Sequence, residues 1–260
     1  MTASAVPLAV RARDVLASEW TKLRSVRSTY WTMLVAVVTP IGLSALVAVT
    51  LANAPGHGPP PDPLLPGVLS QEYAVLAVGV LGVLAFSTEY STGLIRTTFT
   101  AVPRRRTVLA AKTAVVGALT LVVGELVAFA SFALVQAVLS GKHLSVSLSQ
   151  PGVPGAVLAS GLLLFVVATM GLGLGAIIRH TAGGIAALIG LIVLPVILGL
   201  LPAPWGNRLA RFTLFDAVRQ VTALHPAANL FSPALALLVL LAWPAAALGL
   251  AALLITRRDA

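Results

Sequence analysis

Hydrophobic residues gather into six stretches along the 260-residue chain, and most polar residues lie between them. Each stretch is about long enough to cross the ~30 Å hydrocarbon core of a bilayer as an α-helix. The predicted spans are residues 31–52, 72–87, 113–139, 154–178, 183–201 and 233–256. The pattern therefore predicts an all-α fold: a polytopic integral membrane protein with a single transmembrane domain over residues 1–260.

Composition supports the same interpretation. Hydrophobic residues make up 58% of the chain and charged residues only 10%, whereas about a quarter of the residues in soluble domains are charged. Eight acidic and seventeen basic residues cannot cover a fold of this size with a polar surface. The composition therefore predicts that lipid surrounds most of the chain.

Basic residues are distributed unevenly about the spans. Thirteen of the seventeen precede the first span, lie in the second and fourth connections or follow the last span: Arg11, Arg13, Lys22, Arg24, Arg27, Arg96, Arg104, Arg105, Arg106, Lys112, Arg179, Arg257 and Arg258. The other four, Lys142, Arg208, Arg211 and Arg219, belong to the opposite side. Because cytoplasmic loops carry the excess of lysine and arginine, both termini are predicted to be cytoplasmic.

The segment before the first span, residues 8–30, is predicted to be an amphipathic interfacial helix. Its apolar stripe is Leu16, Trp20, Leu23 and Tyr30, and the opposite face holds Asp14, Ser18, Lys22 and Ser25. Tryptophan and tyrosine favour the membrane interface. The helix either anchors the topology or also contacts a cytoplasmic partner.

The second connection, residues 89–112, reads EYSTGLIRTTFTAVPRRRTVLAAK. Gly93 predicts a break soon after the second span, and Pro103 predicts the end of a short helix before Arg104 begins the next. A compact basic element of this kind suits a contact that transmits force. Anchoring of the topology explains the arginines equally well.

Five residues of this connection, Glu89, Gly93, Pro103, Arg105 and Lys112, form a pattern that resembles the permease subunits of type-2 ATP-binding-cassette (ABC) exporters. The opening SEWTKLRSVRSTYW is similar to the N-terminus of actinobacterial members of that family. The resemblance implies a permease in the plasma membrane of a bacterium, working as a homodimer or heterodimer with cytoplasmic ABC ATPase subunits and moving a substrate outward. It also implies that the second connection couples to the ATPase through Glu89, Gly93, Ile95, Arg96, Thr98, Pro103, Arg104, Arg105 and Arg106.

The chain has no ATP-binding loop of its own. A Walker A motif needs a glycine five residues before a Gly-Lys pair, followed by serine or threonine. The one Gly-Lys pair is Gly141-Lys142, with Gln136 five residues before it and His143 after it. We therefore expect no enzyme activity and no cofactor in this chain, with ATP and Mg²⁺ bound by the partner subunit.

The fifth connection, residues 202–232, is predicted to carry one short amphipathic helix on the outer surface. Leu209, Phe212, Phe215 and Val218 lie at helical spacing within it. The family resemblance implies an extracellular re-entrant segment here, with short helices that dip toward the outer leaflet.

Glu125 stands near the middle of the third span, where an ionisable group costs several kcal/mol unless it is neutral, paired or beside water. Phe129, Phe132 and Gln136 share its helical stripe. The stripe predicts a translocation path or a dimer interface, and the alternative is a protonated glutamate bonded to a neighbouring helix. In the fourth span, the four-residue spacing of Gly171 and Gly175 predicts close helix packing.

Other functional classes fit less well. The chain has no cysteine and its four histidines are scattered, so we expect no metal site. Its basic residues flank the spans, which argues against nucleic-acid binding. An intramembrane lipid-modifying enzyme would need clustered acids, and the eight acids are dispersed. An ion-coupled secondary transporter with Glu125 as its proton site, or a non-transporting membrane anchor, stays open.

Overall fold

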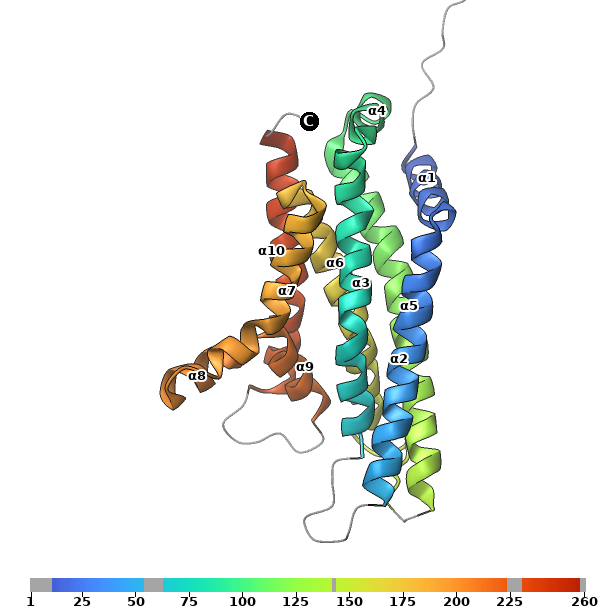
Figure 1. The fold of residues 1–260 in the computed structure, drawn as a ribbon, viewed down its shortest axis with the longest axis vertical. Coiled ribbons are helices and arrows are strands. Elements are labelled where there is room, and N and C mark those ends of the chain that lie inside the picture. Colours follow the sequence, from blue (N-terminus) through green and yellow to red (C-terminus); the bar gives the residue numbers. More distant parts are fainter. Residues whose placement is uncertain (1–10, 54–62, 142–143, 224–230, 258–260) are drawn as a thin grey trace, which may run out of the picture.

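The computed structural model describes residues 11–53, 63–141, 144–223 and 231–257, which form an α-helical bundle without strands (Figure 1). Six of the described helices are long and apolar enough to cross a membrane. They are α2 (Arg27–Ala52), α3 (Leu65–Ser91), α5 (Arg105–Ser140), α6 (Val153–Ile178), α7 (Thr181–Leu198) and α10 (Pro233–Arg257). Four shorter helices are α1 (Ala12–Ser25), α4 (Leu94–Ala101), α8 (Ala203–Ala210) and α9 (Leu214–Thr222). The predicted all-α, multi-pass fold is confirmed.

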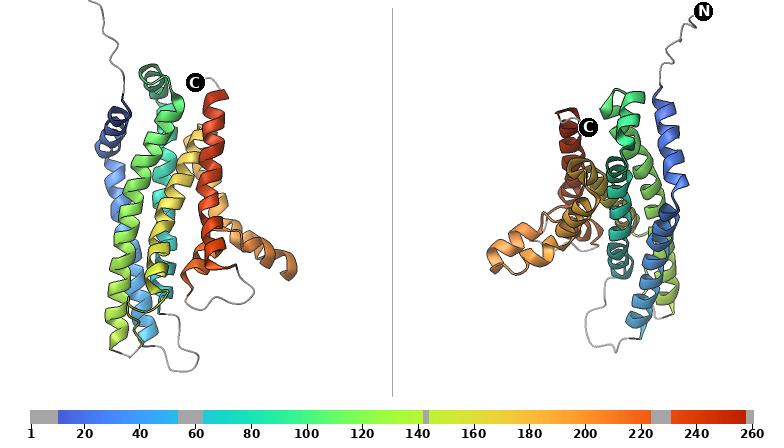
Figure 2. Two further views of the ribbon diagram at one scale, coloured as in Figure 1. Left: turned by 180° about the vertical axis from the view of Figure 1, so that it is seen from behind. Right: turned by 45° about the horizontal axis from the view of Figure 1, so that its top comes forward.

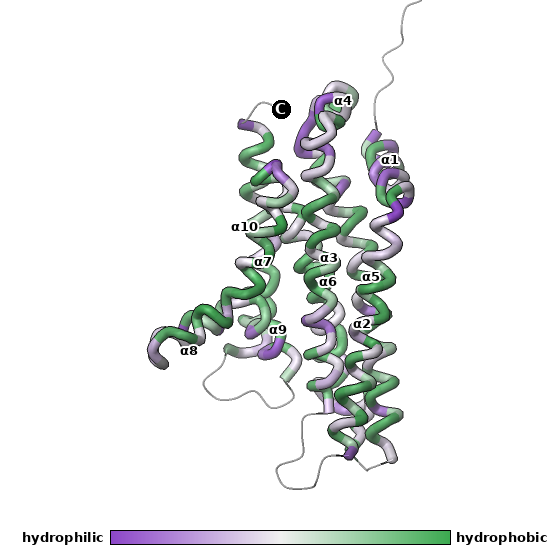
Figure 3. The backbone as a smooth tube through the Cα atoms, in the orientation of Figure 1, coloured by the Kyte–Doolittle hydropathy of each residue, from purple (hydrophilic) through white to green (hydrophobic). Residues whose placement is uncertain are grey.

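Helices α1 and α4 and the last turn of α10 lie at the same end of the bundle, here termed the α4 end (Figures 1 and 2). Hydrophobic residues cover most of the length of the long helices, and hydrophilic ones are frequent in the short helices, among them α1, α4 and α9 (Figure 3). The described basic segments before the first span, in the second connection and at the end of α10 therefore meet at one end. Which side of the membrane that end faces stays a prediction.

Helix α6 is the centre of the bundle and packs against α3, α5 and α10. Its contact with α3 is closest, because glycines on both helices remove the side chains between them. A Cβ atom on Gly175 would lie 2.5 Å from the carbonyl oxygen of Val83, and one on Gly171 would overlap the carbonyl oxygen of Gly79. Gly171 and Gly175 thus lie where two backbones touch.

Two predicted spans begin later than the helices that contain them. The second was predicted from residue 72, but α3 begins at Leu65, and the third was predicted from residue 113, but α5 begins at Arg105. The two predicted boundaries stood at the polar residues Glu72 and Thr113. The polar residues at the predicted start of the second span lie inside α3. Gln71 is fully buried, and the Glu72 carboxylate bonds Arg219 of α9 at 2.7 Å.

The fifth connection departs from the predicted single helix. It forms α8 and α9, separated by residues 211–213. Leu209 and Phe212 are 45% and 53% exposed, whereas Val218 is fully buried, so the four apolar residues do not share one face. Helix α9 packs on α10 and α6, and the indole Nε1 of Trp243 donates to the carbonyl oxygen of Phe212 at 3.0 Å. Residues 224–230 of the predicted segment lie outside the described residues.

The chain's lack of cysteine permits a direct test of its orientation. Ser91, at the α4 end, and Ser149, in the connection between α5 and α6, are both exposed. In intact cells, we expect Ser149→Cys to react with a membrane-impermeant maleimide and Ser91→Cys to react only after permeabilisation. The opposite reactivity would place the α4 end outside the cell.

Candidate functional site

Helix α4 is a short helix set apart from its neighbours by two backbone breaks. After α3 ends, Gly93 takes the left-handed conformation with φ of 74°, which glycine adopts without a Cβ clash. Pro103 then separates α4 from α5. The structure therefore has its breaks at the two positions that Gly93 and Pro103 indicated.

The two faces of α4 differ in their environment. Ile95 and Phe99 are buried at 3% and 9% exposure and pack into the hydrophobic core, which fixes the helix to the bundle. Leu94, Thr97 and Thr100 are exposed on the other side. Ile95, which the sequence had assigned to the ATPase contact, therefore lies on the inner face, and Thr98 is only partly exposed.

The three consecutive arginines also differ from one another. Arg104 and Arg106 are exposed. Arg105 is partly buried: its Nη1 donates to the carbonyl oxygen of Ile255 at 3.2 Å, and its guanidinium lies 5.2 Å from the ring centroid of Phe99. Arg105 thus ties the start of α5 to α4 and to the last turns of α10.

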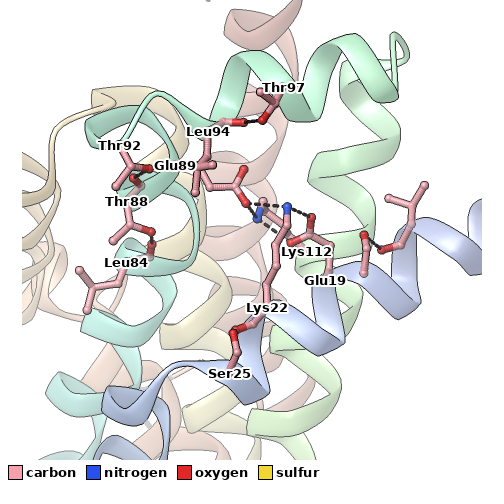
Figure 4. Close-up of polar contacts among 12 residues, drawn as sticks. Glu19, Lys22, Ser25, Leu84, Thr88, Glu89, Thr92, Leu94, Thr97 and Lys112 are labelled. Carbon is pink, nitrogen blue, oxygen red and sulfur yellow. Dashed lines mark hydrogen bonds and ion pairs between the residues drawn. The ribbon is translucent and has the colours of Figure 1, made fainter.

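Four charged side chains from three helices that are far apart in the sequence meet beside α4 (Figure 4). Glu19 and Lys22 come from α1, Glu89 from α3 and Lys112 from α5. The Nζ of Lys112 donates to Glu19 Oε2 at 2.6 Å and to Glu89 Oε1 at 2.7 Å. The Nζ of Lys22 donates to Glu19 Oε1 and Glu89 Oε1, both at 2.8 Å. We call these four residues the charged junction.

The junction is buried to unequal degrees. The side chains of Lys112, Glu19 and Glu89 are 4%, 5% and 7% exposed, whereas that of Lys22 is 44% exposed. Two ammonium groups and two carboxylates are electrically balanced, which is the condition under which charges tolerate burial. The junction therefore holds α1, α3 and α5 in one relative position, because moving any of them would leave a buried charge unpaired.

The pKa of Lys22 reflects this balance. Burial lowers it, but the hydrogen bonds and charges of Glu19 and Glu89 outweigh burial and raise it above the usual 10.5. A lysine with a raised pKa stabilises the fold fully below its unfolded-state pKa and loses that contribution as the pH rises through the folded-state value. Lys22 is therefore a cation at physiological pH.

A second set of contacts brings the turn between α6 and α7 to the same end. The guanidinium of Arg179 lies 4.9 Å from the ring centroid of Tyr90, within the range of a cation–π interaction. The hydroxyls of Ser87 and Thr181 are 3.0 Å apart. The last turn of α3 thus contacts this turn as well as the charged junction.

The predicted apolar stripe of α1 is divided between the bundle and the exposed surface. Val15, Glu19 and Leu23 face the bundle, while Leu16 and Trp20 are 38% and 42% exposed. An interfacial helix turns apolar residues to lipid, so the exposure of Leu16 and Trp20 does not contradict an interfacial position, which stays a prediction. Helix α1 ends at Ser25, so Tyr30 belongs to α2, and residues 8–10 of the predicted helix lie outside the described residues.

The stripe predicted around Glu125 does not form one lining. The Cδ of Glu125 would lie 2.8 Å from a Cβ on Gly161 of α6, so its carboxyl packs against that helix. Phe132 is buried at 9% exposure, and Phe129 is 39% exposed. Gln136 bonds two connecting segments, donating to the carbonyl oxygen of Pro63 at 3.3 Å and accepting from the backbone N–H of Val146 at 2.7 Å. Phe132 and Gln136 are thus engaged within the chain, which argues against a dimer interface made by all four residues.

Sequence reasoning missed Glu19 and Lys22 as members of the site. Their three-residue spacing on one helix was a local signal, but their partners lie 67 to 93 residues away. It also missed the bidentate ion pair between Arg219 and Glu72. Arg219 Nε and Nη2 donate to the Glu72 carboxylate at 2.8 and 2.7 Å, which fixes α9 to α3. Within the described parts of the chain, no three histidine, aspartate or glutamate side chains are grouped to hold a metal ion.

No protein-family model matches this sequence, and no curated protein matches it either. The function of the site is therefore argued from its geometry and from the motif residues themselves.

The two lysines of the junction offer a matched test of its energetics. Lys112→Met leaves two buried carboxylates with one half-exposed partner, and we expect it to lower the free energy of unfolding by about 3–5 kcal/mol. Lys22→Met leaves Lys112 bonded to both carboxylates and should cost about 1 kcal/mol or less. Unfolding of the purified protein in detergent micelles measures both values. Equal losses would show that burial does not govern the junction.

Glu125 can be tested by size-matched replacement. Glu125→Gln keeps the shape that packs against Gly161 and should change the free energy of unfolding by no more than about 1 kcal/mol. Glu125→Leu removes both polar atoms, and we expect it to impair assembly or transport more strongly. Equal and severe loss of transport in two well-folded variants would instead assign a role to the carboxyl's charge or proton.

Proposed function

We propose that this chain is the membrane-spanning permease subunit of a type-2 ABC exporter. In this proposal two permease chains, identical or different, assemble with two cytoplasmic ATPase subunits that bind ATP and Mg²⁺. Helix α4 is the coupling helix. The motif residues Glu89, Gly93, Pro103, Arg105 and Lys112 motivated the proposal, and all five have a structural role in or beside α4.

The observation that carries the proposal is the two-sided environment of α4. Ile95 and Phe99 attach its inner face to the bundle, and Thr97 and Thr100 project from its outer face. A helix that must pass force from a partner to the spans needs both features: a free face for the partner and a firm attachment. A segment that only anchored the topology would need neither the buried face nor the balanced charges behind it.

The charged junction gives the expected route of force. Helix α4 follows directly from α3, whose Glu89 bonds Lys112 of α5, and Lys112 bonds Glu19 of α1. A partner that pushes α4 therefore acts on α1, α3 and α5 as one unit. Closure of the ATPases on ATP would move this unit relative to α7 and α10 and open a path outward.

The outer face of α4 can be tested without disturbing its attachment. In the double variant Thr97→Glu and Thr100→Glu, both new side chains lie on the exposed face and every arginine is kept. We expect the variant to insert and fold normally and to co-purify at least about tenfold less of its ATPase partner, as loss of a central contact does. The amount of ATPase retained on the tagged permease is the measurement.

A matched control carries the same charge change at the opposite end of the bundle. Ser147→Glu with Ser149→Glu alters two exposed hydroxyl residues there, and acidic residues contribute little to topology. This control should retain the ATPase. Equal retention by both double variants would contradict a coupling role for α4, and transport by the chain alone on an ion gradient would contradict the exporter proposal as a whole.

A further inference from the structure

A cavity of about 320 Å³ lies next to the charged junction, within one copy of the chain. Its walls come from the end of α1, the start of α2, the second half of α3, Leu94 at the start of α4 and the early part of α5. It forms where the chain bends at Val26, whose extended backbone separates α1 from α2. The cavity is thus bounded by the three helices that the junction holds together and also by α2 and α4.

The lining of the cavity changes in character along its length. One end is polar, with the charged junction and the hydroxyl residues Ser25, Ser28, Thr29 and Thr88. The other end is apolar, lined by Leu81, Leu84, Ala85, Val115 and Val116. Glu89 and Leu81 are eight residues apart on α3, which separates the two ends by about 12 Å at 1.5 Å per residue. A polar end joined to an apolar end matches an amphiphile rather than a soluble ion.

The charges near the polar end favour an anion. The charged groups that line the cavity, Lys22 and Lys112 against Glu19 and Glu89, balance one another. Arg24 and Arg27 do not line it, but they flank Val26 in the chain and are exposed. They add two positive charges beside the bend, where an anionic headgroup would meet them.

Lys22 is placed to bind that anion. An ammonium group has three N–H donors, and Lys22 gives two of them to Glu19 and Glu89. Its side chain is the one exposed member of the junction, at 44%. Ser28 and Thr29, in the first turn of α2, line the same cavity, and the start of a helix favours negative charge.

We infer that this cavity binds one anionic phospholipid. The lipid phosphate accepts from Lys22 and the start of α2, and an acyl chain lies against Leu81, Ala85 and Val116. The inference does not depend on the proposed exporter function, because the cavity lies inside a single chain and needs no ATPase.

Bound lipid counted by native mass spectrometry tests the inference. The purified, delipidated chain is mixed in detergent with phosphatidylglycerol or with phosphatidylcholine. We expect one phosphatidylglycerol retained per chain and weaker retention of phosphatidylcholine. Lys22→Gln should weaken retention about tenfold, as loss of a charge-assisted hydrogen bond does. Ala85→Phe should abolish it by filling the apolar end without changing any charge.

Arg13→Gln is the matched control, because Arg13 is an exposed cation of α1 that does not line the cavity. Equal weakening in Arg13→Gln and Lys22→Gln would show only diffuse attraction and overturn the inference. Four other results would also overturn the inference. They are full retention of lipid by Ala85→Phe, equal retention of the two lipids, displacement of the lipid by millimolar inorganic phosphate, and a dimer that excludes lipid from the cavity. If Lys22→Gln does not fold, Ser28→Ala and Ala85→Phe decide the matter by the same measurement.

Discussion

The position of the whole α4 end depends on one buried ammonium group. Lys112 enters the structure from the third membrane span and bonds one carboxylate from α1 and one from α3. Breaking such a buried arrangement on one side costs several kcal/mol, because the remaining charge cannot reach water. The chain has only eight acidic residues, and two of them are placed here. Helix α1 therefore has a defined position on the bundle, although most of its surface is exposed.

The middle of the bundle is held by a different force. Between α3 and α6 there is no ionic contact among the described residues, and the helices are joined by close backbone packing at Gly171 and Gly175. Lipid supplies no hydrophobic force between spans, so close packing must come from small residues. Ion pairs thus stabilise the α4 end, where water is near. Close backbone packing stabilises the centre of the bundle, which is away from water.

The sequence was sufficient for features that depend on local chemistry. The number of spans follows from hydropathy, and the breaks around α4 follow from the backbone requirements of Gly93 and Pro103. Features that depend on pairing between distant segments were not predictable. Nothing near Glu19 indicates that its carboxylate meets Lys112, 93 residues away.

The errors share one physical cause. Hydrophobicity marks what avoids water, but in a membrane it does not distinguish lipid from protein core. Ile95 was therefore assigned to a partner surface, although its side chain is buried in the bundle. Polar residues misled in the opposite sense: the second span was predicted to begin only at residue 72, whereas α3 begins at Leu65 and contains Gln71 fully buried.

Helix α5 runs from Arg105 to Ser140 as one helix of 36 residues, with no proline along it. Lys112, near its start, belongs to the charged junction. Gln136, near its end, hydrogen-bonds the connecting segments at Pro63 and Val146, at the opposite end of the bundle. Lys112 and Gln136 are 24 residues apart, or about 36 Å along the axis. Helix α5 therefore joins the two ends of the bundle without an interruption, so that a tilt applied at Lys112 would also displace Gln136.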